Sequence, residues 1–198
     1  MAGPNLKRAP WTLTHVHGAR LASLARRLYL RVTHLHAELR FAHGVFLGSG
    51  FSLWIPEHGT LEVGSNVVFR RGCHIEIAGE GRVSIGAGTV FTSNALIQCS
   101  SSIEIGRRCQ LGQSALIVDG NHRFRDTSRP TLEQGYDLRP IRIGDDVLVT
   151  TKCTVLADIG EHSVIGANSV VSRDIPPYSL AVGAPAKVIE SFEPAAGP

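Results

Sequence analysis

The 198-residue chain lacks any apolar run of the roughly 20 residues that a membrane-spanning helix needs. Aromatic residues are scarce, at 6%, and the basic N-terminus is not followed by the apolar stretch and cleavage site of a signal peptide. We therefore expect a single cytoplasmic domain. A domain of this length buries enough surface to fold without disulfide bonds or a bound metal.

The chain has only four cysteines, and none of them forms a CxxC pair. They are Cys73, Cys99, Cys109 and Cys153, and all lie in apolar segments. Their spacing indicates neither a metal-binding pair nor a disulfide framework. We interpret all four as small core residues of a protein in a reducing compartment.

The net charge of +3 is unevenly distributed along the chain. The first 44 residues contain seven basic residues and one acid, so this segment carries +6 and the remainder carries −3. The chain has no nucleic-acid-binding signature and no aromatic side chains arranged to stack on bases. We therefore expect no nucleic-acid partner.

Large apolar residues recur at every sixth position through much of the chain. Three such runs are Val63, Phe69 and Ile75, then Ile85, Phe91 and Ile97, and later Ile143, Val149 and Val155. A period of six fits neither a helix nor an alternating strand. It fits a coil with three flat sides, in which each hexapeptide forms one side and its large residue points inward. The expected fold is all-β, a parallel β-helix of hexapeptide repeats.

The repeats divide the chain into three parts. Residues 1–44 form a basic leader, residues 45–176 form the β-helix, and residues 177–198 form a C-terminal tail. Residues 119–140 break the six-residue period and contain turn-forming residues, so we expect a loop extruded from the coil. Long loops inside a compact repeat are uncommon and usually functional.

The leader contains leucines at spacings of three, four and seven, which predict an N-terminal amphipathic helix. These leucines are Leu21, Leu24, Leu28, Leu35 and Leu39. A basic helix of this kind could make peripheral contact with the inner face of a membrane, plug the open end of the β-helix, or pack on a neighbouring subunit. We favour the plug, because an open β-helix end exposes core residues and strand edges.

The most notable local motif is Asp119-Gly120-Asn121-His122 at the start of the extruded loop. An imidazole titrates near neutral pH, so His122 could accept a proton from a hydroxyl or amine that attacks a thioester. A general base of this kind accelerates a reaction by about 10²–10⁴-fold. The alternative is a loop histidine that caps its own backbone.

The C-terminal half resembles the hexapeptide-repeat O-acetyltransferases, which include galactoside, maltose, xenobiotic and polysaccharide-pathway acetyltransferases. The motifs are IGD at 143–145, SVIGANSVV at 163–171, SRDIPPY at 172–178 and GAPAKVI at 183–189. The resemblance covers roughly residues 60–190. It implies a left-handed coil, a homotrimer with active sites between subunits, acetyl-CoA as acyl donor and no metal.

The resemblance also assigns roles to individual residues. His122 matches the family's general base. Five other positions match its coenzyme-binding residues: Thr151 and Ala167 at amide contacts, Ser172 and Arg173 near the adenosine phosphates, and Lys187 in the closing motif. Two features depart from the family and lie on its coenzyme side. Leu148 stands where tryptophan is usual, and the coil side from Val155 to Ile159 is two residues short.

The acceptor side is less well defined. Asn94 and Asp119 are candidate acceptor-binding residues, with a corner residue and an Asx-turn as the respective alternatives. The expected reaction is transfer of an acetyl or other short acyl group from coenzyme A to a hydroxyl of a sugar, glycan precursor or glycosylated small molecule. Alternatives are an amino-sugar N-acetyltransferase, an antibiotic acetyltransferase, a γ-carbonic-anhydrase-like metalloenzyme and a non-catalytic scaffold.

Overall fold

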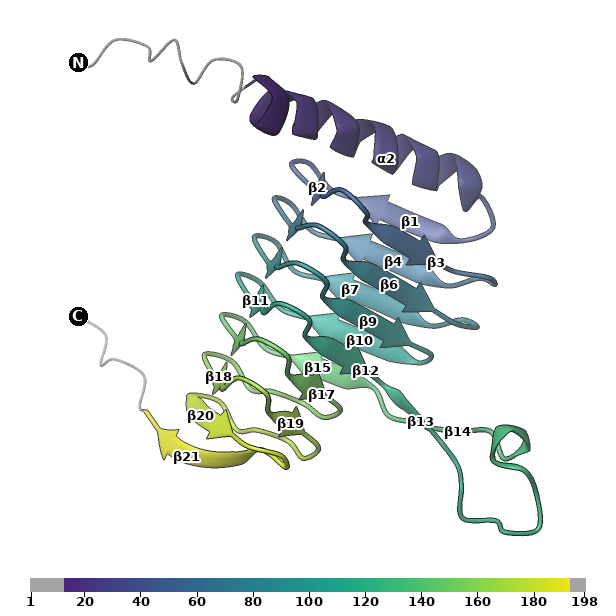
Figure 1. Ribbon diagram of the computed structural model, residues 1–198, viewed down its shortest axis with the longest axis vertical. Helices are drawn as coiled ribbons and strands as arrows, with labels where there is room; N and C mark the ends of the chain where they lie inside the picture. The colour runs from purple at the N-terminus through teal and green to yellow at the C-terminus, as the bar shows by residue number, and fades with distance from the viewer. Residues whose placement is uncertain (1–12, 193–198) are drawn as a thin grey trace.

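The computed structural model describes residues 13–192 and shows one helix lying across the end of a parallel β-helix (Figure 1). The chain begins with a π-helical turn, η2 (Leu13–Gly18), and the helix α2 (Ala19–Thr33). The strands that follow pair in parallel with strands one coil away and form three flat sheets. The expectation of an all-β parallel β-helix with an N-terminal helix is confirmed.

Each side of the prism is one sheet. Sheet A contains β1 (Glu38–Phe41), β4 (Thr60–Val63), β7 (Arg82–Ile85), β10 (Ser102–Ile105) and β15 (Ile141–Ile143). Sheet B contains β2 (Phe46–Leu47), β5 (Val68–Phe69), β8 (Val90–Phe91), β11 (Gln110–Leu111), β16 (Leu148–Val149), β18 (Val164–Ile165), β20 (Ser179–Val182) and β21 (Lys187–Ser191). Sheet C contains β3 (Ser52–Trp54), β6 (His74–Ile77), β9 (Leu96–Cys99), β12 (Leu116–Val118), β17 (Thr154–Val155) and β19 (Val170–Val171).

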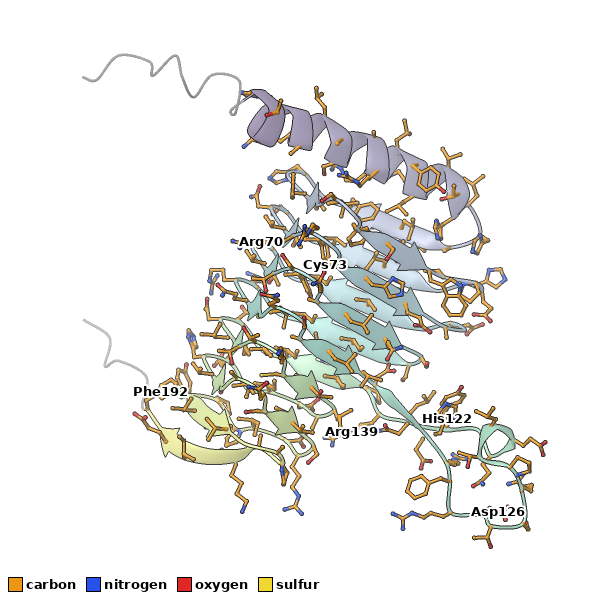
Figure 2. All side chains as sticks on the ribbon, in the orientation of Figure 1. Arg70, Cys73, His122, Asp126, Arg139 and Phe192 are labelled. Atoms are coloured by element: carbon orange, nitrogen blue, oxygen red, sulfur yellow. The ribbon has the colours of Figure 1, made fainter. Side chains whose placement is uncertain are left out.

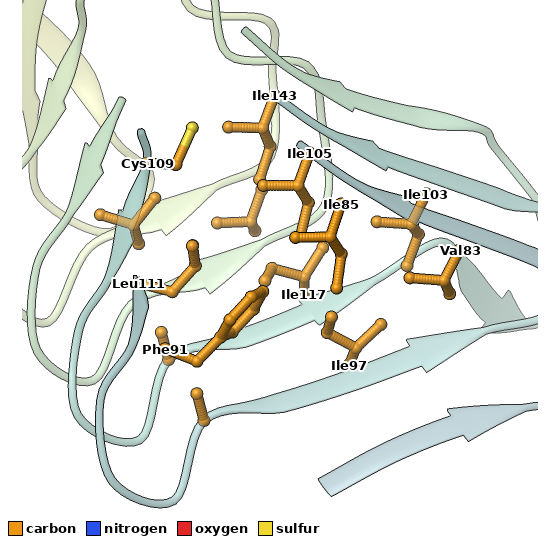
Figure 3. Packing of buried hydrophobic residues seen from close by; sticks show 14 of the residues in the cluster. Val83, Ile85, Phe91, Ile97, Ile103, Ile105, Cys109, Leu111, Ile117 and Ile143 are labelled. Atoms are coloured by element: carbon orange, nitrogen blue, oxygen red, sulfur yellow. The ribbon is translucent and has the colours of Figure 1, made fainter. Parts of the chain in front are cut away.

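The six-residue positions line the interior of the prism, where equivalent residues of successive coils stack (Figure 3). Phe69 and Phe91 stack with ring centroids 4.6 Å apart, and Phe51 meets Phe69 edge-on at 5.0 Å. Apolar stacking of this kind contributes both buried area and favourable ring geometry. The inward orientation that the repeat predicts is therefore confirmed.

All four cysteines are buried and free, which confirms them as core residues. Burial, together with the neighbouring Asp119 carboxylate, raises the pKa of the Cys99 thiol to about 12. Such a thiol stays protonated and unreactive at neutral pH.

The three edges of the prism are named after the sheets they join: edge AB, edge BC and edge CA. Edge BC turns in every coil through residues in the left-handed backbone region. Examples are Asn94, Ser114, Lys152 and Asn168, with φ between 56° and 60°. Edge CA is variable. Val63 pairs with Ile85, 22 residues later, whereas Ile143 bridges to Ile159, only 16 residues later.

The coil extends beyond both predicted boundaries. It begins at β1, which pairs with β4 although it precedes residue 45. It continues past residue 176, because β20 pairs in parallel with β18 before β21 returns antiparallel. The hexapeptide pattern misses both strands for a simple reason. The first carries no aliphatic–glycine pair, and the inward residue of the second is the small Ala181.

Helix α2 covers the open end of the coil, but Leu21, Leu24 and Leu28 from the predicted apolar stripe are exposed. Leu47 in the first strand of sheet B donates its N–H to Ser23 Oγ at 2.8 Å, and its carbonyl accepts from the Arg26 guanidinium at 3.0 Å. Leu30 is buried beneath the helix. The helix thus satisfies exposed strand-edge groups, which would otherwise lack partners. Within residues 13–192, no helix is long and apolar enough to cross a bilayer.

Candidate active site

Residues 119–140 form an arm that projects from edge CA (Figure 1). Strand β13 (Gly120–His122) pairs antiparallel with β14 (Tyr136–Leu138), and a 3₁₀ turn, η3 (Thr131–Glu133), lies near the tip. His122 is exposed on this arm (Figure 2), with its ring 4.3 Å from that of Tyr136. Among the residues described, none forms a hydrogen bond with the His122 imidazole. Neither ring nitrogen is occupied by these residues, so the unprotonated nitrogen of the neutral ring can accept a substrate proton.

Asp119 anchors the base of the arm. Its carboxylate is buried and accepts the N–H groups of Ser100 at 2.7 Å and Ser101 at 2.8 Å, and the Cys99 thiol at 3.3 Å. Its carbonyl accepts the Arg139 N–H at 2.7 Å, which ties the two ends of the arm together. The carboxylate therefore caps a buried corner of the preceding coil at Ser100 and Ser101, and these bonds are not those of a local Asx-turn.

The distal arm is held by a second polar cluster. Gln134 is buried, and its amide donates to the carbonyls of Asp126 at 2.8 Å and Arg129 at 3.0 Å. Hydrogen bonds from Ser128 and then from Arg129 lower the pKa of the Asp126 carboxyl. The arm is therefore internally cross-linked at its tip as well as at its base.

Three of the predicted coenzyme positions meet at the lower end of edge BC. Thr151 and Ala167 are exposed in successive coils, and the Asn168 N–H donates to the Thr151 carbonyl at 3.0 Å. In the described chain, the N–H groups of Thr151 and Ala167 themselves donate to no protein acceptor. They are free to bind a ligand carbonyl, as are the equivalent turn residues of other coils.

The closing turn brings Lys187 to the same place. Ala186 donates its N–H to the Val170 carbonyl at 2.8 Å, and Gly183 donates to Ser169 Oγ at 3.0 Å. These bonds fold the chain back beside the last corner of edge BC. Lys187 is exposed and forms no ion pair with any residue in the range 13–192.

The remaining predicted residues lie elsewhere. Ser172 and Arg173 follow β19 on edge CA, and the Arg173 guanidinium has no ion-pair partner within the described range. Asn94 lies on edge BC with φ 60°, and its side chain covers Gly72, where a Cβ would come within 2.2 Å of Asn94 Oδ1. Within one chain, Asn94 is therefore a corner residue on a different edge from His122.

Sequence reasoning missed two residues that position the arm. Tyr136 supports the His122 ring, and Arg139 forms an ion pair with Asp174 two coils below the arm's departure. Neither residue has a local signal, because each contact depends on the hairpin or on coil stacking. No group of three His, Cys, Asp or Glu residues capable of holding a metal occurs in residues 13–192 of a single chain.

Curated proteins with similar sequences carry acetyltransferase names. The chain is 37% identical over 150 residues to a Mycobacterium tuberculosis protein provisionally named acetyltransferase Rv3034c, a match covering 74% of this chain and 50% of the relative. It is 28% identical over 151 residues to WbbJ of Escherichia coli, provisionally named a lipopolysaccharide biosynthesis O-acetyl transferase, covering 72% and 77%. The chain spans about half the length of the first curated relatives it matches.

A solved structure agrees with these sequence matches. The hexapeptide-repeat acetyltransferase VCA0836 of Vibrio cholerae superimposes with a TM-score of 0.58 at 25% identity, over 87% of this chain and 82% of that one. The chain is thus similar in sequence and in fold to hexapeptide-repeat acetyltransferases. The parallel sheets of the chain and this structural match agree with the left-handed β-helix that the sequence resemblance implied. No protein-family model matches the chain.

Proposed function

We propose that this hexapeptide-repeat protein transfers an acetyl or other short acyl group from coenzyme A to a hydroxyl of a sugar-type acceptor. The observation that carries the proposal is the exposed His122 imidazole at the root of an anchored arm, with no protein partner among the described residues. Two relatives support the chemistry. The name of WbbJ refers to O-acetyl transfer, and VCA0836 has been solved with acetyl coenzyme A.

In the proposed reaction, a ring nitrogen of His122 accepts the proton of the acceptor hydroxyl. The hydroxyl oxygen forms a bond to the thioester carbonyl carbon, and the carbon–sulfur bond then breaks. The departing coenzyme A thiolate takes the proton from the imidazolium, which restores the neutral histidine. Tyr136 supports the ring face during both transfers.

The free N–H groups of Thr151 and Ala167 would bind the pantetheine amides of the coenzyme. Arg173 and Lys187 have no ion-pair partner among residues 13–192. They suit the phosphates of the coenzyme, since charge-assisted hydrogen bonds to phosphate are short and strong. Thr151, Ala167 and Lys187 lie on edge BC, whereas His122 and Arg173 lie on edge CA. A single chain therefore does not present all of these groups together.

A homotrimer would resolve this separation. In a three-fold ring, each subunit contact joins one surface of a chain to a different surface of the next chain. Edge CA of one copy can therefore face edge BC of its neighbour. The arm also exposes apolar side chains that such a contact would cover. They are Phe124, Leu132, Tyr136 and Leu138. Each active site would then combine His122 of one copy with Thr151, Ala167 and Lys187 of its neighbour.

An acceptor panel tests the proposal. The full chain is incubated with acetyl-CoA and, separately, with neutral sugars, sugar nucleotides and amino sugars, while free thiol is measured and acetylated products are identified by mass spectrometry. We expect thiol release that requires a hydroxyl acceptor. Product formation with amines alone would replace the proposal with N-acetyl transfer, and no acceptor-dependent thiol release together with no acetyl-CoA binding would overturn it.

A further inference from the structure

Helix α2 carries an exposed apolar face on the side opposite to the coil. Leu21, Leu24, Leu28, Tyr29 and Val32 are between 52% and 67% exposed. Helical geometry places these residues on one side, about half a turn from Ser23 and Leu30, which face the coil. A surface helix normally turns its apolar side inward. Here the backbone N–H and carbonyl of Leu47 need hydrogen-bond partners, which Ser23 and Arg26 of the helix provide. The helix therefore turns this polar side toward the coil, and its apolar face stays uncovered.

One border of this apolar face is strongly basic. Arg20, Arg27 and Arg31 occur at spacings of seven and four, so they follow one line along the helix. In the described structure none of the three forms a salt bridge, and Ala19–Thr33 contains no acidic residue. The border therefore presents unneutralised positive charge beside the exposed leucines.

Arg27 provides a second observation that points to an anionic ligand. Its Nε atom is buried from solvent and has no hydrogen-bond partner. The side chain lines two hollows of about 390 and 580 Å³, one also lined by Leu28 and Arg31 and the other by Arg20 and Phe46. A buried guanidinium donor without an acceptor is costly. An oxygen of a bound phosphate would satisfy it.

We propose that this face of α2 binds the anionic surface of a lipid bilayer. The leucines would enter the boundary between headgroups and acyl chains, and the arginines would bind lipid phosphates. Charge complementarity favours this occupant over a second copy of the chain. If two copies met through this face, arginines would lie opposite arginines, with no acid on the helix to neutralise them.

Vesicle co-sedimentation of the full chain tests the proposal. We expect binding to phosphatidylcholine vesicles that contain about one third phosphatidylglycerol, and little binding to phosphatidylcholine alone. The double variant Leu24→Glu/Leu28→Glu should lose at least about tenfold in binding. Arg27→Gln should lose about fivefold, the change that corresponds to roughly 1 kcal/mol per cation near the surface.

The matched control is Ile189→Glu, since Ile189 is 62% exposed but lies in β21, at the end of the coil opposite α2 (Figure 1). This variant should bind vesicles like the unmodified chain. Failure of the unmodified chain to bind anionic vesicles would overturn the proposal, and so would equal losses in the control and the helix variants. If light scattering shows that the helix variants change the oligomeric state while vesicle binding is unchanged, the face binds another copy instead. Acceptor-dependent thiol release in solution is measured separately, so its outcome does not bear on vesicle binding.

Discussion

Edges BC and CA of the prism follow opposite rules. Along edge BC, the step between inward residues is six in every coil, as from Phe69 to Ile75 and from Val149 to Val155. Along edge CA, the step varies from ten residues, between Ile75 and Ile85, to four, between Val155 and Ile159, and one step is expanded into the arm. The inward positions remain stacked throughout.

This difference shows how a repeat fold can vary without losing its core. A change of length on one edge leaves the strands of all three sheets paired, provided that the other two edges keep their spacing. The constant edge preserves the register, and the variable edge accommodates an insertion with a reactive side chain. The two-residue shortening noticed in the sequence lies on the variable edge, where it disturbs neither sheet register nor core.

The largest expected effect concerns His122 on the variable edge. His122→Ala should lower acyl transfer by about 100-fold or more, because the attacking hydroxyl loses its general base. The folded state should be retained, since the exposed imidazole makes no hydrogen bond in the described structure. Initial rates of thiol release provide the measurement.

His58→Ala is the matched control for this variant. His58 is also an exposed histidine on edge CA, but it lies in an earlier coil. Its variant should keep nearly full activity. Equal rates in the His122 variant and the unmodified chain would remove His122 from the mechanism.

The second prediction concerns the division of the active site between the two edges. Ala167→Glu should block the coenzyme contact on edge BC, and His122→Ala removes the base on edge CA. When the two inactive variants are unfolded together and refolded as mixed trimers, roughly a quarter of the activity should return, because that fraction of interfaces combines the two intact edges. A site contained within one chain predicts no recovery, and separately refolded variants serve as the control.

A third prediction compares glycines on the two edges. At Gly112 on edge BC, a Cβ would lie 2.3 Å from backbone atoms of Thr150, so Gly112→Ala should lower the free energy of unfolding by about 3 kcal/mol or more. At Gly79 on edge CA, no atom lies within 4 Å of the added Cβ. Gly79→Ala should cost only about 1 kcal/mol, from its left-handed backbone.

Urea unfolding at one fixed protein concentration measures both glycine variants, since assembly would couple stability to concentration. If both variants lost the same free energy of unfolding, edge BC would not be less tolerant of an added side chain than edge CA, which would contradict the prediction.

The smallest effect is expected on edge AB, which is the third edge. Arg108 donates to Asp146 through Nε at 2.7 Å and lowers the pKa of its carboxyl. The contribution to stability is full above the unfolded pKa of about 3.9 and is lost as pH falls through the lower folded value. Arg108→Ala should therefore cost up to about 1 kcal/mol at pH 7 and less near pH 3, because part of the Asp146 carboxyl is then protonated.

Unfolding curves at the two pH values measure this difference, with Asp146→Asn as the control that removes the titrating group. A cost that is the same at both pH values would show that Arg108 acts through packing and not through its charge.

The sequence predicted the features that depend on local repetition. Six-residue spacing identified the core, its interruption located the arm, and the DGNH motif identified His122 at the arm's root. It could not predict the contact between Tyr136 and His122 or the ion pair between Arg139 and Asp174. Those contacts join residues that are distant along the chain, and they require the hairpin and the stacked coils to exist first.

Helix α2 shows the same division between what the sequence predicts and what the tertiary structure decides. Its leucine spacing predicted an amphipathic helix, because helical periodicity is a local property. The helix ends at Thr33, so Leu35 and Leu39 of the predicted stripe lie outside it, in a turn and in β1. Which side packs on the coil was decided by the unpaired backbone groups of Leu47, which Ser23 and Arg26 satisfy. Periodicity therefore established the helix, the prism and the arm. Long-range hydrogen-bond satisfaction decided which face is buried, which edge carries each functional group, and hence which surfaces remain open for partners.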